Sequence, residues 1–199
     1  MAQLSKIKVG STTYNVRDDI HTWGGRNLLK FTDWYVTGVY GLSNCTMNLT
    51  TDASAPGGKV LRLTLTDSTK NAHCHLSSMK SRGGMVSGET YIASLYVRAS
   101  AAMSRPTNQT MECSSNLTRI NNVNITTGWV QQGIKFVYNP NASYQAWYFI
   151  YPALWSGLSN GKYIDIAGVK LEHGNKITDW SPAPEDIAHV NGECLELIS

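Results

Sequence analysis

The first chemistry that this sequence offers is that of aromatic rings, in the stretch SYQAWYFIYPALW. Side chains alternate between the two faces of a strand, so Tyr144 and Tyr148 share one side while Trp147 and Phe149 share the other. One interpretation places Trp147 and Phe149 in a core and the tyrosines on a surface or an interface. The other makes Tyr144, Tyr148 and Trp155 an exposed platform on which a pyranose ring stacks. The first interpretation needs fewer assumptions, and both stay open.

A metal site is the second chemistry to consider, at His73-Cys74-His75. In a strand the two imidazoles point the same way and Cys74 points to the opposite side. Two ligands are too few for zinc, and no third ligand stands at motif spacing, so we expect a surface pair of histidines. The cysteines are widely spaced and form no Cys-x-x-Cys pair, which favours buried free thiols. They are Cys45, Cys74, Cys113 and Cys194.

Catalysis has little support in the pattern of carboxylates. A glycoside hydrolase needs two of them about 5–10 Å apart, and the sequence pairs none of its candidates. It contains no Gly-x-Ser-x-Gly elbow, His-Glu-x-x-His helix or phosphate-binding glycine loop. We therefore expect a protein that is not an enzyme and needs no cofactor. The acidic residues considered are Asp33, Asp52, Asp67, Asp165, Glu172 and Asp179.

Composition narrows the class of protein further. Of the 199 residues only 16% are charged, and the formal charge is +3, without the basic stripe that nucleic-acid binding requires. No apolar run reaches the roughly 20 residues that cross a bilayer. The N-terminus lacks the apolar region of a secretory signal. We expect neither nucleic-acid binding, nor membrane insertion, nor export by that route.

The elements that must position these residues are strands. In KVLRLTLTD three leucines alternate with polar residues, and in ETYIASLYVRAS the residues Tyr91, Ala93, Leu95 and Val97 share one side. This pattern indicates a sheet with one apolar and one solvated face. Such segments recur about every 10–15 residues without a convincing helix, so an antiparallel sandwich of two sheets is expected. The other segments are RNLLKFTDW, CTMNLTT, NAHCHLSSM, TMECSSNLTRI, NNVNITTG, GWVQQGIKFVYNP and KYIDIAGVKLE.

The last predicted strand and the residues after it close the sandwich. In KYIDIAGVKLE the two isoleucines face one way and the apolar run continues beyond Gly168, which predicts a bulge or a close backbone contact at this glycine. Trp180 is expected to fold its ring back over the end of the sandwich. Pro182 and Pro184 then prevent further sheet pairing and stiffen the chain where it leaves the sandwich.

Four segments resemble the jelly-roll domains grouped with carbohydrate-binding modules: GRNLLKFTDW, GETYIASLYVRAS, TGWVQQGIKFVYNP and YIDIAGVKLEHGNKITDWSPAPED. This resemblance covers residues 25–186. The combination of GRNLL with KLEHGNKITDWSPAPED is more specific, and resembles tail-fibre, baseplate and other appendage proteins of bacteriophages and prophages. The opening LSKIKVGSTTYNVRD resembles the N-terminal segments of such virion proteins. The resemblance implies a jelly-roll domain displayed on a virion, where it meets host surface glycan.

The sequence departs from the binding-module pattern at one point. Many of those modules hold a structural calcium with an acidic residue of the last strand, in an Asp-x-Val context. Ala167 stands at that position in this chain, and Asp165, two residues earlier on the same side of the strand, is the remaining weak candidate. A hard cation needs several converging oxygens, so bound calcium is not expected.

The two ends of the chain are too apolar for solvated tails. SKIKVGSTTYNV predicts a hairpin, and a lone two-stranded hairpin is barely stable in water. IAHVNGECLELIS is too short to make a core alone. Such segments commonly bury themselves on neighbouring subunits by strand addition, and packing on their own sandwich is the alternative. The expected assembly contacts are Ile7, Val9, Tyr14, Val16, Leu195, Leu197 and Ile198.

Together these observations predict an all-β protein, with an N-terminal attachment arm (1–24), an antiparallel jelly-roll β-sandwich (25–182) and a short C-terminal extension (183–199). The expected function is that of a non-enzymatic structural component of a phage virion: a fibre, baseplate, neck or capsid-surface appendage assembled in the bacterial host cytoplasm. Its expected partners are other virion proteins and further copies of itself, with a trimer favoured. The alternative is a carbohydrate-binding module that recognises host surface glycans.

Overall fold

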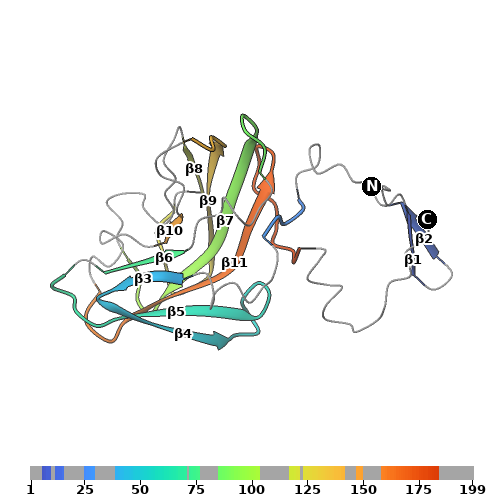
Figure 1. Cartoon of the computed structure of the whole chain (residues 1–199). Helices are drawn as coiled ribbons and strands as arrows, with labels where there is room; N and C mark the ends of the chain where they lie inside the picture. Colours follow the sequence, from blue (N-terminus) through green and yellow to red (C-terminus); the bar gives the residue numbers. More distant parts are fainter. Residues whose placement is uncertain are drawn as a thin grey trace.

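The structure is a computed structural model. None of the residues that it describes is helical, and every strand pairing among them is antiparallel. The predicted all-β, antiparallel fold class is confirmed, and Figure 1 shows the arrangement of its strands. The described residues are 6–9, 12–15, 25–29, 39–70, 72–76, 85–103, 117–121, 123–141, 147–149 and 158–183.

The described strands form three sheets. The largest has six strands in the order β4-β5-β11-β7-β9-β8, and the second has three in the order β10-β6-β3. The six are β4 (Cys45–Thr51), β5 (Lys59–Leu65), β11 (Tyr163–His173), β7 (Thr90–Ala99), β9 (Val130–Val137) and β8 (Thr118–Ile120). The three are β10 (Trp147–Phe149), β6 (His73–Leu76) and β3 (Val39–Ser43), and a separate pair is β1 (Lys6–Val9) with β2 (Thr12–Asn15).

The core lies on one face of the six-stranded sheet, because apolar side chains alternate along its strands. On β7 the residues Tyr91, Ala93, Leu95 and Val97 all belong to the core, as the sequence pattern predicts. The leucines of β5 and the isoleucines of β11 join them, and the three-stranded sheet forms the second layer of the sandwich (Figure 1). Each fully buried Leu, Ile or Val side chain among them stabilises the fold by about 1.5–3 kcal/mol relative to exposure.

A β-bulge lets the long strand β11 keep its apolar side chains in the core along its length. The register of β11 with β7 shifts between Ala167 and Lys170, and Gly168 has a φ of 53°. The apolar residues on both sides of the bulge therefore face the core. Gly168 also allows a close approach, since a Cβ at this position would lie 2.8 Å from the Cβ of Pro56. The prediction of a bulge or a close backbone contact at Gly168 is confirmed by the bulge.

Two segments predicted as strands are irregular where the structure describes them. Residues 26–29, from RNLLKFTDW, form no strand because the Asn27 side chain takes up backbone groups, its Oδ1 accepting hydrogen bonds from the N–H groups of Leu29 and Leu171. Residues 123–128, from NNVNITTG, also form no strand. The Thr126 hydroxyl bonds to the backbone of Gly128, and such local side-chain bonds compete with a sheet ladder.

The predicted N-terminal hairpin is confirmed as a pair of strands. In β1 and β2, Ile7 stands opposite Tyr14 and Val9 opposite Thr12, and the pair forms a sheet of its own. The boundaries of the arm and of the C-terminal extension stay predictions. Among the described residues, no helix is long and apolar enough to cross a membrane. The other predicted assembly contacts lie outside the described residues: Val16, Leu195, Leu197 and Ile198.

Candidate binding site on the outer sheet face

The face of the six-stranded sheet that points away from the core, called the outer face below, carries a row of charged side chains. Strand alternation places Arg62 of β5, Asp165 of β11 and Arg98 of β7 on this face. The register sets the three side by side, since Asp165 stands opposite Arg62 on one neighbouring strand and opposite Arg98 on the other. These three residues are called the arginine row.

Hydrogen bonds join the arginine row into one unit. Arg62 donates from Nε and Nη2 to the two oxygens of Asp165, at 2.7 and 2.8 Å. Arg98 donates from Nε and Nη2 to Oδ2 of the same carboxylate, at 3.0 and 2.9 Å. The Asp165 side chain is fully buried, while those of Arg62 and Arg98 are 32% and 20% exposed. These charge-assisted bonds therefore fix the orientation of two guanidinium groups that water can still reach.

Two aromatic rings flank the arginine row. The Cζ atom of Arg62 lies 3.7 Å from the ring centre of Tyr163, and that of Arg98 lies 4.5 Å from a ring centre of Trp129. Both distances are typical of cation–π contacts. The indole N–H of Trp129 donates to the Ser54 hydroxyl at 3.2 Å, which ties this ring to the loop between β4 and β5. The half-buried rings thus help to hold the guanidinium planes in place.

A further carboxylate, that of Asp52 in the same loop, reaches the arginine row from its rim. Asp52 Oδ2 lies 2.6 Å from Arg98 Nη2, and the Asp52 side chain is 24% exposed. Asp52 Oδ1 accepts hydrogen bonds from the backbone N–H and the hydroxyl of Ser54, at 2.8 and 2.7 Å. These bonds from Ser54, and then Arg98, lower the pKa of Asp52 below its ordinary value. Asp52 is therefore ionised at neutral pH.

The arrangement presents hydrogen-bond donors on a rigid surface. A guanidinium has five N–H donors, and the Nη1 groups of Arg62 and Arg98 make none of the hydrogen bonds found among the described residues. Hydroxyl or carboxylate oxygens of a ligand can accept hydrogen bonds from these groups. Because Asp165 and the two rings already hold the arginines, little side-chain freedom is lost when a ligand binds.

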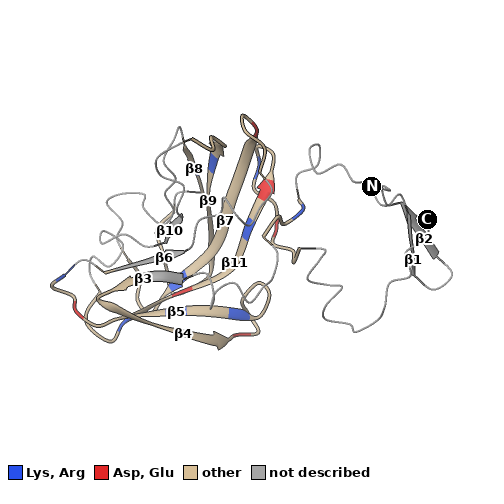
Figure 2. Cartoon of the chain, in the orientation of Figure 1, with Lys and Arg blue, Asp and Glu red and all other residues tan. Residues whose placement is uncertain are grey.

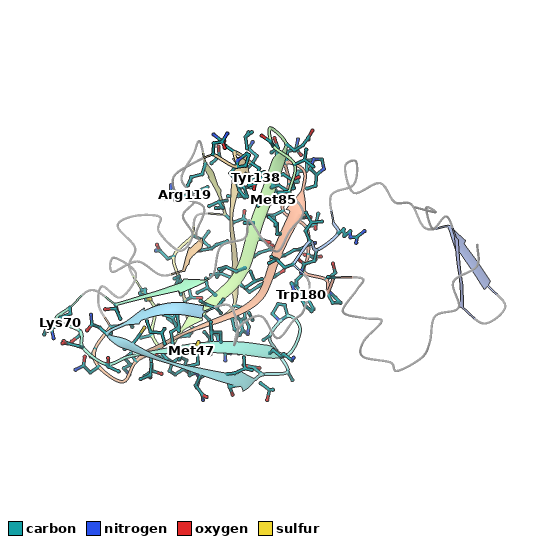
Figure 3. The ribbon with its side chains drawn as sticks, in the orientation of Figure 1. Met47, Lys70, Met85, Arg119, Tyr138 and Trp180 are labelled. Atoms are coloured by element: carbon teal, nitrogen blue, oxygen red, sulfur yellow. The ribbon has the colours of Figure 1, made fainter. Side chains whose placement is uncertain are left out.

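Another part of the outer face is covered by residues 174–183, called the C-terminal strap below. Its Trp180 ring lies so close to the sheet that a Cβ added at Gly168 would be 3.3 Å from Cγ of the ring, and one at Gly57 2.7 Å from its Cη2. Figure 3 shows Trp180 in this place. The prediction that Trp180 folds back onto the sandwich is confirmed. The ring packs on the outer face, between the bulge of β11 and Gly57 in the turn that joins β4 to β5.

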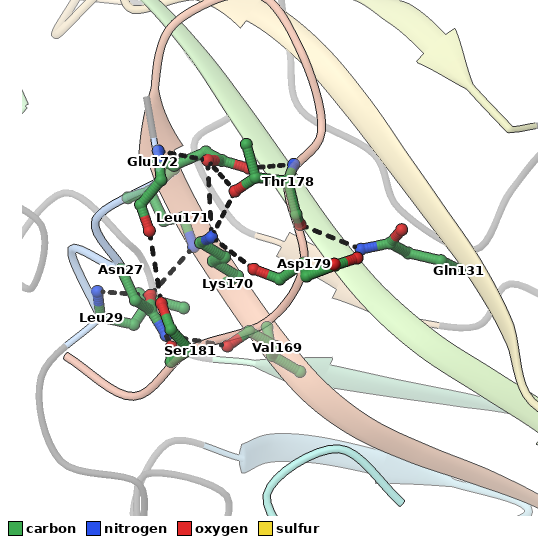
Figure 4. A network of polar contacts seen from close by, with 11 residues as sticks. Asn27, Leu29, Gln131, Val169, Lys170, Leu171, Glu172, Thr178, Asp179 and Ser181 are labelled. Carbon is green, nitrogen blue, oxygen red and sulfur yellow. Dashed lines mark hydrogen bonds and ion pairs between the residues drawn. The ribbon is translucent and has the colours of Figure 1, made fainter. Parts of the chain in front are cut away.

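Buried charges lie beneath the strap (Figure 4). The side chains of Lys170 and Glu172 are 1% and 0% exposed, and Nζ of Lys170 is 3.5 Å from the Glu172 carboxylate. Lys170 donates to the Thr178 hydroxyl and to the Asp179 carbonyl, while Glu172 accepts from the N–H and the hydroxyl of Thr178. Burial lowers the pKa of Lys170, and Glu172 opposes this shift. The solvated outer face predicted from strand alternation is wrong at this point, because the strap covers it.

Residues 25–29, called the leading segment below, are hydrogen-bonded to the same part of β11. The N–H of Gly25 donates to Glu172 at 2.8 Å, and the Asn27 amide donates to the carbonyls of Val169 and Ser181. The Ser181 hydroxyl donates in turn to the Gly25 carbonyl. The leading segment and the C-terminal strap therefore lie side by side against β11, as Figures 1 and 4 show.

The aromatic platform predicted from the sequence stays a prediction. Tyr144 and Trp155 lie outside the described residues. Tyr148 lies on β10 opposite His75 of β6, and the structure does not describe its side chain. His73, the other histidine of the candidate pair, stands opposite Ser43 of β3. Among the residues that the structure describes, no group of three or more His, Cys, Asp or Glu side chains is placed to hold a metal ion.

Asp165, the weak calcium candidate, lies in surroundings that the sequence did not indicate. Two guanidinium groups supply the positive charge next to its carboxylate, whereas a calcium site needs several converging oxygens. Sequence reasoning therefore missed Arg62 and Arg98 as site residues. Their place on the outward side of alternating strands was the available signal, and the register that joins them to Asp165 links positions 62, 98 and 165.

Comparisons with known proteins give similarities to solved structures alone. No protein-family model matches the chain, and no curated protein matches its sequence. The xylan-binding domain CBM22-1 from Paenibacillus barcinonensis is 12% identical, with a TM-score of 0.42 over 76% of this chain and 94% of that one. A sugar binding protein from Bacteroides thetaiotaomicron is 11% identical, with a TM-score of 0.44 over 75% and 100%. A CBM4 structure is 14% identical, with a TM-score of 0.37 over 68% and 81%. Likenesses this distant carry no argument about a ligand.

Proposed function

We propose that the protein binds carbohydrate, and that the arginine row with Tyr163 and Trp129 forms the binding surface. The observation behind this proposal is a set of rigid, partly exposed donors flanked by aromatic rings on one sheet face. A sugar offers hydroxyl groups in fixed directions and apolar C–H faces, so convergent donors beside rings suit it. The sequence resemblance to carbohydrate-binding modules agrees with this function.

The surroundings of the carboxylates favour binding without catalysis. Asp165 is buried between two guanidinium groups, and Glu172 lies beneath the strap with its oxygens hydrogen-bonded. A glycoside hydrolase needs two carboxyl groups facing each other across the bond to be cut. Neither of these two is placed to reach a substrate, and the partly exposed Asp52 at the rim of the row is paired with Arg98. We propose that the protein leaves its ligand chemically unchanged.

The proposal is tested by glycan retention with single variants. Trp129→Ala and Arg62→Ala should each weaken retention on immobilised polysaccharides, neutral and acidic, by at least about tenfold, the loss expected of one binding contact. Lys70→Ala is the matched control, because Lys70 is a 67% exposed cation that pairs with Asp67 away from the row. Tyr148→Ala tests the platform predicted from the sequence. If no polysaccharide is retained, or if Trp129→Ala and Arg62→Ala behave like the control, this binding surface is refuted.

A structural role in a phage virion is the second function that we propose, with further copies of the chain and other virion proteins as partners. Two observations favour it: β1 and β2 form a sheet of their own, and the two segments that join the arm and the extension to the sandwich are fastened to each other. The N-terminal arm and the C-terminal extension then leave the sandwich at one place, so both can bind the same partner. Particles assembled with a chain lacking residues 1–22 should lose this protein, and normal incorporation would refute the role.

A further inference from the structure

We infer that the ligand of the arginine row is an acidic saccharide, whose carboxylate binds Arg62 and Arg98, and that Asp52 is an internal competitor for this place. The inference rests on the proposed carbohydrate binding and narrows it to one class of sugar. It follows from the charge balance of the row, from the way Asp52 is held, and from the shape of the donor surface.

The charge balance of the row leaves one positive charge for a partner. Asp165 is the buried anion of the row, and it accepts hydrogen bonds from both Arg62 and Arg98. One carboxylate and two guanidinium groups together carry a net charge of +1. The buried Lys170 and Glu172 pair with each other beneath the strap, so they contribute no net charge.

Asp52 supplies the missing negative charge in the structure, but from a partly exposed position. Its carboxylate contacts Arg98 at 2.6 Å and is 24% exposed, whereas Asp165 is 0% exposed. Asp52 belongs to the loop between β4 and β5, and Ser54 holds its other oxygen. An ion pair that water can reach is weak. A ligand carboxylate can therefore take its place on Arg98.

The donor surface fits a planar anion better than a neutral hydroxyl. A guanidinium matches the geometry of a carboxylate and binds it by two parallel hydrogen bonds. The Nη1 groups of Arg62 and Arg98 make none of the hydrogen bonds found among the described residues. Tyr163 and Trp129 lie against the two guanidinium groups, so the sugar ring attached to the carboxylate has aromatic rings next to it.

The experiment compares two ligands that differ in the carboxylate alone: an oligosaccharide of galacturonic acid and its carboxyl-reduced galactose counterpart. Titration calorimetry should give the acidic ligand the higher affinity, and its affinity should fall as salt is raised. Asp52→Asn keeps an oxygen for Ser54 and removes the competing charge. It should raise the affinity for the acidic ligand by about two- to fivefold, the equivalent of a partly exposed ion pair.

Asp67→Asn is the matched control, because Asp67 accepts hydrogen bonds from Thr69 in the way that Asp52 does from Ser54, and pairs with Lys70 instead of the row. It should leave the affinity unchanged. Equal or better binding of the galactose ligand would overturn the inference while carbohydrate binding stands. An unchanged or lower affinity of Asp52→Asn for the acidic ligand would overturn the competitor role. If neither these ligands nor any polysaccharide binds, the inference falls together with the proposed function.

Discussion

At the scale of single residues, Asp165 governs the geometry of the candidate site. A carboxylate buried in a sheet is costly unless its charge is paired and its oxygens are hydrogen-bonded. Asp165 meets both conditions through Arg62 and Arg98, which stand opposite it on the neighbouring strands. The buried anion in turn holds two long and otherwise flexible side chains in one orientation. Stability and the shape of the candidate site therefore depend on the same group.

Replacing Asp165 by Asn should lower the free energy of unfolding by about 2–3 kcal/mol. This is less than the 3–5 kcal/mol lost when a fully buried ion pair is broken, because both arginines keep contact with water. Urea unfolding followed by tryptophan fluorescence measures the change. Asp67→Asn is the control, since Asp67 pairs with a 67% exposed lysine at the surface and such pairs add little. Equal effects of the two substitutions would show that the row contributes nothing to stability.

At the scale of elements, the loop between β4 and β5 and the C-terminal strap meet over the bulge of β11. A comparison of Gly57→Ala with Gly58→Ala separates the effect of the Trp180 contact from the effect of backbone conformation. Both glycines have positive φ, 77° and 69°. A Cβ at position 57 would lie 2.7 Å from Trp180, and one at 58 has nothing within 4 Å. Both variants should lose about 1 kcal/mol for the left-handed conformation, and Gly57→Ala about 1–3 kcal/mol more for overpacking. Thermal unfolding of both proteins decides this, and equal losses would contradict the packing of Trp180.

The strap is also held by a hydrogen-bond network, in which Thr178 joins two buried charges. Thr178→Val keeps the shape of the side chain but removes the hydroxyl that donates to Glu172 and accepts from Lys170. Hydrogen bonds to charged groups contribute more than neutral ones, so we expect a loss of about 2–3 kcal/mol. Thr178→Ser retains the hydroxyl and should lose less than half of that. Amide hydrogen exchange should show the strap opening more often in the Val variant. Equal exchange rates and equal stability of the two variants would show that the Thr178 hydroxyl does not hold the strap.

The elements were easier to predict from the sequence than the site. Alternation in KVLRLTLTD and ETYIASLYVRAS predicted the core correctly, because a period of two is a local property of a strand. The bulge at Gly168 was also predictable, because a glycine inside a strand pattern is itself a local signal. Alternation also predicted a solvated outer face, and this was wrong at Lys170 and Glu172, where the strap covers that face. A pattern assigns a residue to a face of the sheet. The segment that covers this face, and the register that joins Arg62, Asp165 and Arg98, depend on contacts distant in sequence.

At the scale of the whole molecule, the leading segment, the strap and the arginine row are all arranged along β11. The leading segment and the strap are tied to Glu172 near the end of the strand, while the arginine row is centred on Asp165 near its beginning. Six residues of β11 lie between these two positions, and the bulge between Ala167 and Lys170 falls among them. The strap also extends toward the candidate site, since Trp180 packs against Gly57 in the loop that carries Asp52 and Ser54.

The arm itself yields a prediction about assembly. Removing residues 1–22 should turn the expected trimer into a monomer and leave the unfolding midpoint of the sandwich unchanged. The physical reason is that β1 and β2 form a sheet separate from the other two, and an isolated hairpin is too unstable to persist unless it packs against another surface. Light scattering gives the mass, and circular dichroism during heating gives the midpoint.

Ile7→Ser, at a position opposite Tyr14, is the milder variant and should weaken association without shortening the chain. A truncated protein that unfolds at a lower temperature would mean that the hairpin packs on its own sandwich, and an unchanged mass would mean that the arm plays no part in assembly.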